Sequence, residues 1–382
     1  METLRFIAFS MPLILILAAL SLLAILIWTL TRRTKGLAEV KSEKDGREYL
    51  AKLNVTPLPE FNWEATEPLQ FRPFKPIYHI TMALKSRTPS DLIVIDRNYL
   101  SRIEERRRTM DNHRKHTLGC LPVAIEAVQE VYSYLLGEYL PVRYPTIFTR
   151  DEKSFRNRVT SVSLPLLPPE DPIVALRSLG ETVEDDMFFL RETPEGHECT
   201  AFVCCCPSGF DPAEKIGKLL KDIHEPVPSY EKIGSSMERY FSRLEVGKTV
   251  SRVNWSVTTN PELFNVSGNH VYEVDQVEED ADVDIKKAFV RMELQTMTRM
   301  PKTRAILFSF KTYLCPVEEI KAEGLGPDLA DAIEGLGKGN APGMWVYKGG
   351  IRWGKSGNPV LGLGRGGDSG DPYLSISLLV AL

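Results

Sequence analysis

A long apolar run near the start of the chain is the most conspicuous hydrophobic feature of the sequence. Residues 6–30 contain no charged residue and are dominated by Leu, Ile and Ala, and about 20 such residues suffice to cross a bilayer as a helix. A cleaved signal peptide is the alternative, but its apolar region would span only about 7 to 15 residues. The run therefore predicts one transmembrane helix within an N-terminal anchor, residues 1–35.

Basic residues follow this run, so the positive-inside rule places the rest of the chain in the cytosol. We accordingly expect a single-pass membrane protein whose main domain faces the cytosol, with the endoplasmic reticulum as the default membrane. Residues 36–75 are first charged and then proline-containing, with little periodicity. They predict a linker between the anchor and a folded domain.

Beyond the linker, the pattern indicates both helices and strands, and the chain length is compatible with one large α+β domain. A hairpin is indicated where the runs 187–190 and 200–206 flank a Pro-Glu-Gly turn at 194–196. Two more strands are expected within 288–313, joined near Met300. The remaining predicted elements are a strand at 252–258 and amphipathic helices at 122–139, 212–224, 230–244 and 316–336.

The end of the helix predicted at 212–224 is defined by proline. Asp211 and Pro212 are typical of an N-cap and a first helical residue. Pro226 disfavours helical geometry for the residue before it, so the helix should stop at about His224. An imidazole on a rigid helix end is suited to be an axial metal or haem ligand. The alternative is a protonated histidine that interacts favourably with the helix dipole.

A second group of candidate site residues follows strand spacing. Arg291, Glu293 and Gln295 alternate along one predicted strand, so all three side chains belong to one face. This face is either exposed to solvent or lines a polar pocket. Residues 252–255 form a similar mixed strand.

Composition narrows the class of protein. The chain has 47 basic and 51 acidic residues and a formal net charge of −4, which argues against nucleic-acid binding by bulk positive charge. Three of the six cysteines, residues 204–206, are consecutive and predict a buried strand of free thiols, which favours a reducing compartment. The arginines at 102 and 106–108 predict a solvated helix face. The Gly-rich tail, residues 349–382, is expected to be disordered.

Several segments carry a family resemblance, in constant order and spacing from about residue 72 to residue 348. The chain resembles the haem-dependent oxidative N-demethylase family, which indicates one family domain over residues 76–348. The matching segments are YHITMAL (78–84), DRNYLSRIEERRR (96–108), VEDD (183–186), CPSGFDPAEKIGKLLKDIHEPVPSY (206–230), RVNW (252–255) and RMELQTMTRMPKTRAILFSFKTY (291–313).

The resemblance implies a haem domain with a PAS-like antiparallel sheet and flanking helices. The implied activity removes a methyl group from a secondary amine with O₂ and two electrons, and releases formaldehyde. A separate reductase that carries flavin and an iron–sulfur centre would supply the electrons.

The resemblance also assigns roles. It makes His224 the candidate axial ligand of the haem iron. The candidate catalytic residues, on the polar side of the pocket, are Arg291, Glu293 and Gln295. Cations suit the haem propionates, and the candidates for this contact are Lys215, Lys218 and Arg252.

Two departures from the family pattern bear on the function. Leu294 stands where the pattern has a second arginine, and residues 183–186 read Val-Glu-Asp-Asp where the pattern has Val-Gln-Glu-Asp. A changed pocket would alter the amine substrate or catalysis itself. The alternatives are a non-catalytic haem-binding PAS-like sensor and a haem-free interaction domain at a membrane surface.

Overall fold

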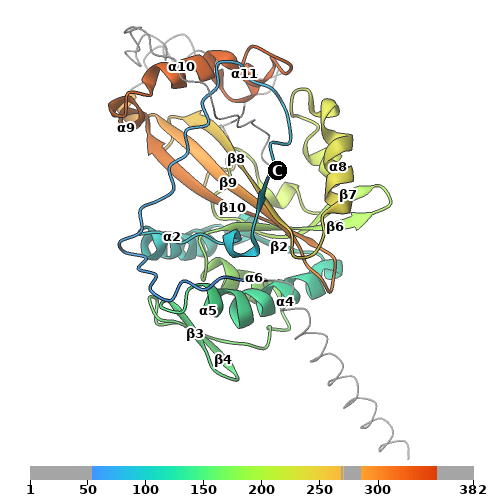
Figure 1. Ribbon diagram of the computed structural model, residues 1–382. Coiled ribbons are helices and arrows are strands. Elements are labelled where there is room, and N and C mark those ends of the chain that lie inside the picture. Colours follow the sequence, from blue (N-terminus) through green and yellow to red (C-terminus); the bar gives the residue numbers. More distant parts are fainter. Residues whose placement is uncertain (1–53, 268–269, 271–284, 351–382) are drawn as a thin grey trace, which may run out of the picture. The chain divides into compact units, whose positions relative to one another are not determined.

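A seven-stranded antiparallel sheet forms the centre of the protein (Figure 1). The computed structural model describes residues 54–267, 270 and 285–350, and these belong to one compact unit, Asn54–Leu382. Helices combined with an antiparallel sheet confirm the predicted α+β class. In sheet order the strands are β1 (Lys85–Arg87), β8 (Thr249–Thr258), β9 (Phe289–Arg299), β10 (Ile306–Pro316), β6 (Asp186–Thr193), β7 (Gly196–Val203) and β2 (Leu118–Cys120).

Two hairpins in this sheet follow the sequence pattern. Strands β6 and β7 pair across a turn at residues 194–195, and Gly196 has a φ of 129°, which a residue without a Cβ adopts readily. Strands β9 and β10 pair over their whole lengths and meet at a turn that begins at Met300. Both predicted hairpins are confirmed. A separate three-stranded sheet contains β3 (Phe148–Arg150), β4 (Ser154–Asn157) and β5 (Ser163–Pro165).

Helices cover both faces of the large sheet. In Figure 1, α2, α4, α5 and α6 lie on one side, and α8 to α11 lie on the other. The central strands are consequently buried on both faces, as the burial of nearly every residue of β9 shows. The helices are α2 (Tyr99–Asn112), α3 (Arg114–Thr117), α4 (Ile125–Tyr134), α5 (Leu140–Arg143), α6 (Pro172–Gly180), α7 (Leu220–Ile223), α8 (Gly234–Arg243), α9 (Val317–Ala322), α10 (Gly326–Gly335) and α11 (Met344–Tyr347).

The predicted helix 212–224 is not continuous. Asp211 does cap its start by accepting a hydrogen bond from the Ala213 amide at 2.9 Å, but the first turn is a 3₁₀ helix that ends at Glu214. Gly217 then takes a left-handed φ of 78°, which interrupts helical geometry. Helix α7 begins only at Leu220. A positive-φ glycine, Gly324, likewise divides the predicted helix 316–336 into α9 and α10.

The predicted membrane attachment requires a correction. Within residues 54–267, 270 and 285–350, no helix combines the length and apolar content needed to cross a bilayer. Helix α2 has only 14 residues and is rich in Arg and Glu, whereas a span requires about 20 apolar residues. The expectation of a single-pass membrane protein of the endoplasmic reticulum is therefore not supported and is withdrawn. The run on which it rested, residues 6–30, lies outside the described residues.

The second half of the predicted linker contacts the domain. The Leu58 amide donates to the Arg143 carbonyl at 2.9 Å, and Arg72 forms an ion pair with Glu323. Residues 54–75 thus run along the surface of the family domain. The predicted tail lies outside the described residues beyond Gly350.

Candidate functional site

His224 lies at the end of α7 and is almost fully buried, with 3% of its surface exposed. Its Nδ1 lies 2.7 Å from the Leu220 carbonyl oxygen, one helical turn back. A carbonyl can only accept, so Nδ1 carries the hydrogen, and Nε2 presents a lone pair in the neutral ring. The ring also stacks on Tyr230, with centroids 4.8 Å apart. The imidazole is therefore fixed in orientation, with one nitrogen available to a ligand.

Burial keeps this imidazole neutral. The pKa of His224 is lowered to about 4, mainly by loss of hydration and to a smaller extent by the charge of Arg252, against the opposing effect of the hydrogen bond to the Leu220 carbonyl. A metal ligand must be deprotonated, so the low pKa favours coordination at neutral pH. It also disfavours the alternative of a protonated histidine at the helix end.

The cavity beside His224 is mostly apolar and has an empty volume of about 390 Å³. Side chains fill most of this space, so a large ligand would have to displace some of them. Three of these side chains are methionines, which change conformation readily. The lining residues are Met82, Leu84, Leu190, Leu220, His224, Met237, Phe241, Arg252, Met297 and Phe308.

The strand face that carries the predicted catalytic residues continues into this cavity. Arg291, Glu293 and Gln295 alternate along β9, and the same alternation leads to Met297 in the cavity lining. The three residues are 1%, 3% and 1% exposed, so the predicted alternative of a solvent face is wrong. The structure brings all three together on one buried face.

Hydrogen bonds link this face to the cavity. Arg252 on β8 lies directly opposite Gln295 and donates to its side-chain oxygen at 2.6 Å. Gln295 in turn donates to Glu293 Oε2 at 3.0 Å, and Asn254 donates to the same oxygen at 3.2 Å. Loss of hydration lowers the pKa of Arg252 to about 10. A polar chain thus runs from the cavity along β8 and β9.

Lys348 lies at the far end of this chain of hydrogen-bonded side chains, and the sequence pattern did not single it out. Its ammonium donates to Asn254 Oδ1 at 3.1 Å and to the Trp255 carbonyl at 2.5 Å. Burial lowers the pKa of Lys348 to about 8. Arg291 donates to the Cys206 carbonyl at 2.6 Å, so this hydrogen bond also holds the segment after β7 against β9.

The two predicted propionate-binding lysines lie elsewhere. Lys215 is half-buried with its ammonium 5.7 Å from the centre of the Phe210 ring, and burial lowers its pKa. Lys218 is exposed. Neither lines the cavity beside His224, whereas Arg252 does.

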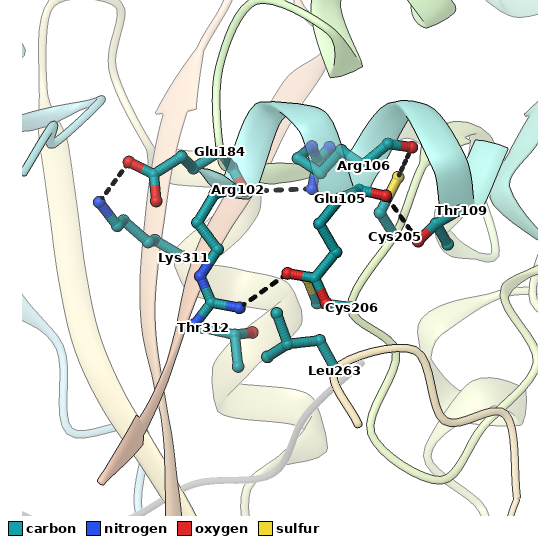
Figure 2. A pocket seen from close by; sticks show the side chains of 10 residues that line it. All are labelled: Arg102, Glu105, Arg106, Thr109, Glu184, Cys205, Cys206, Leu263, Lys311 and Thr312. Carbon is teal, nitrogen blue, oxygen red and sulfur yellow. Dashed lines mark hydrogen bonds and ion pairs between the residues drawn. The ribbon is translucent and has the colours of Figure 1, made fainter. Parts of the chain in front are cut away.

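A second buried polar cluster lies on the opposite face of the sheet. Lys311 of β10 donates to Asp96 at 2.7 Å and to Glu184 at 2.8 Å, and all three are buried. Burial alone would lower the pKa of Lys311, but the two carboxylates outweigh it and raise that pKa. Figure 2 shows Lys311 and Glu184 facing one another in a small pocket, with Arg102 beside Glu105. A lysine within an apolar strand was the sequence signal for this cluster.

Arg106 and the consecutive cysteines belong to the same region and require two corrections. Arg106 is 2% exposed and pairs with Asp186 at 2.5 Å, so it does not lie on a solvated helix face.

Residues 204–206 follow the end of β7 at Val203 instead of continuing the strand. The amides of Cys205 and Cys206 donate to Asp186 at 2.7 and 2.8 Å. The cysteines are free thiols, as expected.

Asp185 in this cluster gives a pH prediction. Burial is the main cause that raises its pKa from 3.8 to about 7. The folded state therefore binds this proton more tightly than the unfolded state, and stability is lost as pH rises from about 4 through 7. We expect Asp185→Asn to gain roughly 2 kcal/mol over the parent protein between pH 5 and pH 8, at about 1.4 kcal/mol per pKa unit.

Urea unfolding at the two pH values measures this gain. The exposed Asp331→Asn serves as the matched control and should show none. Equal pH dependence in the parent protein and Asp185→Asn would contradict the prediction.

The residues beside His224 suit an apolar ligand with a metal centre, which would enter as lining side chains move aside. A neutral imidazole projects from a rigid helix end, the walls are apolar, and a single cation of the lining, Arg252, connects to the polar chain. Among the described residues, no group of three His, Cys, Asp or Glu side chains could hold a metal by itself. A single neutral imidazole and an apolar lining are the groups that a protein offers to an iron held by a porphyrin.

The departure at Leu294 does not alter the candidate face. Leu294 lies between Glu293 and Gln295, so its side chain belongs to the other face of β9, opposite Lys311 in the neighbouring strand. The altered position is therefore next to the Lys311 cluster and away from the cavity beside His224.

Comparison with protein families agrees with the resemblance in the sequence. A family model described as haem-dependent oxidative N-demethylase, alpha subunit-like, matches residues 83–357, which is most of the chain. The match includes α7, β8, β9 and β10, and thus every element that carries the polar chain and His224. The chain therefore belongs to the family of haem-dependent oxidative N-demethylase alpha subunit-like proteins.

Proposed function

We propose that this protein is a haem-dependent oxidative N-demethylase that removes a methyl group from a secondary amine and releases formaldehyde. O₂ and two electrons would be consumed, and a separate reductase with flavin and iron–sulfur centres would deliver the electrons. The observation that carries the proposal is the position of His224. Its imidazole is neutral and buried beside an apolar cavity, and buried, hydrogen-bonded polar side chains border that cavity. In this proposal the antiparallel sheet with its flanking helices is a PAS-like haem-binding core.

The residues of this chain would have distinct roles. His224 would hold the haem through Nε2, with Leu220 fixing the ring orientation. When bound, the haem would supply the oxidation of the methyl group, which side chains alone cannot perform. The apolar lining would exclude water from the reacting centre.

The polar chain would orient the amine. A secondary amine is cationic in neutral water, and a buried cation needs a compensating anion. Glu293 is the carboxylate of the hydrogen-bonded group beside the cavity. Gln295 and Asn254 donate to it, and Arg252 donates to Gln295. Arg291, whose Nε lies 3.8 Å from Glu293, would limit the excess negative charge in the absence of substrate.

An absorption spectrum of the full chain, produced with haem supply, tests the proposal first. A Soret band with near-stoichiometric haem in the pyridine haemochrome assay is expected. An amine screen with a reductase should then show formaldehyde release that depends on substrate. Haem without any turnover would favour the sensor, and a folded, colourless protein would overturn both haem-based functions.

Replacing Glu293 with glutamine tests the role of the carboxylate. The variant should retain haem, because Glu293 does not line the cavity, while formaldehyde release falls about tenfold to a hundredfold. Haem content and initial rates on one preparation separate the two effects. The exposed Glu104→Gln is the control, and an unchanged rate in Glu293→Gln would remove this residue from the site.

A further inference from the structure

A wide groove lies next to the cavity that contains His224. Its empty volume is about 1160 Å³, and β1, α8 and the segment between α8 and β8 form its walls. Most of its charged lining residues are cations. They are Arg87, Arg239, Arg243 and Lys248, opposed by the single acid Glu245.

Within the described part of the chain, none of these four cations forms an ion pair with an acidic side chain. Arg239 donates only to Ser236 Oγ at 3.0 Å, and Arg87 donates to Ser251 Oγ at 2.8 Å. Unpaired cations around one hollow create a positive potential that favours an anionic ligand. A ligand with at least two negative charges fits this arrangement better than a neutral one.

The groove adjoins the cavity directly. Met82 lines both spaces, and α8 contributes side chains to both. Met237 and Phe241, four residues apart, belong to the cavity. Arg239 and Arg243, also four residues apart, belong to the groove. A ligand with an apolar body and an anionic edge would therefore find both environments side by side.

We propose that this groove binds the two propionate carboxylates of the haem whose iron His224 holds. The inference rests on the proposed function and adds the residues that orient the porphyrin. The apolar ring occupies the cavity, and its dianionic edge passes Met82 to the arginines of α8. Arg–carboxylate pairing is strong and directional, so it fixes which edge of the ring faces outward.

This assignment differs from the one that the sequence suggested. Lys215 and Lys218 come before α7 and line neither space, whereas the groove cations face one hollow together. Lys218 therefore provides a matched control, since it is an exposed cation from the competing set.

The test compares haem with haem dimethyl ester, in which both carboxylates are neutral. Affinities of the full chain are measured by Soret titration for the parent protein, the double variant R239Q/R243Q and the control K218Q. Glutamine is a good helix former, so the double variant should fold. We expect R239Q/R243Q to bind haem about tenfold more weakly than the parent protein does, but to bind the ester with the affinity of the parent. K218Q should bind haem as the parent protein does.

Two other results would overturn the inference in distinguishable ways. If R239Q/R243Q binds haem as the parent does, or K218Q alone is weakened, the propionates lie elsewhere and the proposed function stands. If the parent protein binds neither haem nor its ester, the proposed function fails and the inference fails with it.

Discussion

Replacing His224 with alanine is expected to abolish stoichiometric haem binding, with affinity reduced on the order of a hundredfold or more. The reason is geometric, because Nε2 of this ring is the nitrogen that the Leu220 hydrogen bond leaves available beside the cavity. Soret titration and the pyridine haemochrome assay measure the loss. Circular dichroism shows whether the variant remains folded.

Two further variants make this result specific. The exposed His79→Ala should bind haem normally. In His224→Gly, added imidazole should restore a Soret band, since the free ring can occupy the space of the missing side chain. Normal haem binding by folded His224→Ala would refute the assignment of the axial ligand.

Replacing Lys311 with methionine is expected to destabilise the fold by about 3 to 5 kcal/mol. The substitution would leave the carboxylates of Asp96 and Glu184 buried without their cation. Burial already raises the pKa of Glu184, and the charge of Lys311 opposes that increase. Without the lysine this pKa should rise further, so the loss should be larger at pH 8 than at pH 5.

Urea unfolding at both pH values measures this loss. The exposed Lys302→Met is the matched control and should change stability by no more than about 0.5 kcal/mol. A destabilisation of Lys311→Met no larger than that of the control would show that the cluster contributes little to the fold.

Local signals in the sequence were sufficient for much of the architecture. Two mostly apolar runs around a Pro-Glu-Gly turn predicted the β6–β7 hairpin, and the period of two along β9 placed Arg291, Glu293 and Gln295 on one face. These features depend on residues that are close in sequence, and the geometry of a strand is the same in every protein. The family followed from the order of several such segments.

Local signals failed where a residue's environment comes from distant segments. The pattern could not decide between solvent and a polar pocket for the β9 face, because the helices that bury it are far away in the sequence. The same holds for Arg106, whose partner Asp186 is 80 residues away and holds it inside the protein. The sequence pattern also allowed a continuous helix through Gly217, but in the fold the positive φ of Gly217 interrupts helical geometry before α7 begins.

The sequence by itself determined the α+β class, the hairpins, the family and the candidate ligand His224, because each depends on local periodicity or on the order of segments. Only the tertiary structure decided that burial lowers the pKa of His224, that Arg252 in the same cavity reaches Glu293 through Gln295, and that Lys311 pairs with two buried acids. It also placed beside the cavity four cations that form no ion pair within the described part of the chain. Burial and charge pairing arise between residues far apart in the chain, so no local pattern encodes them.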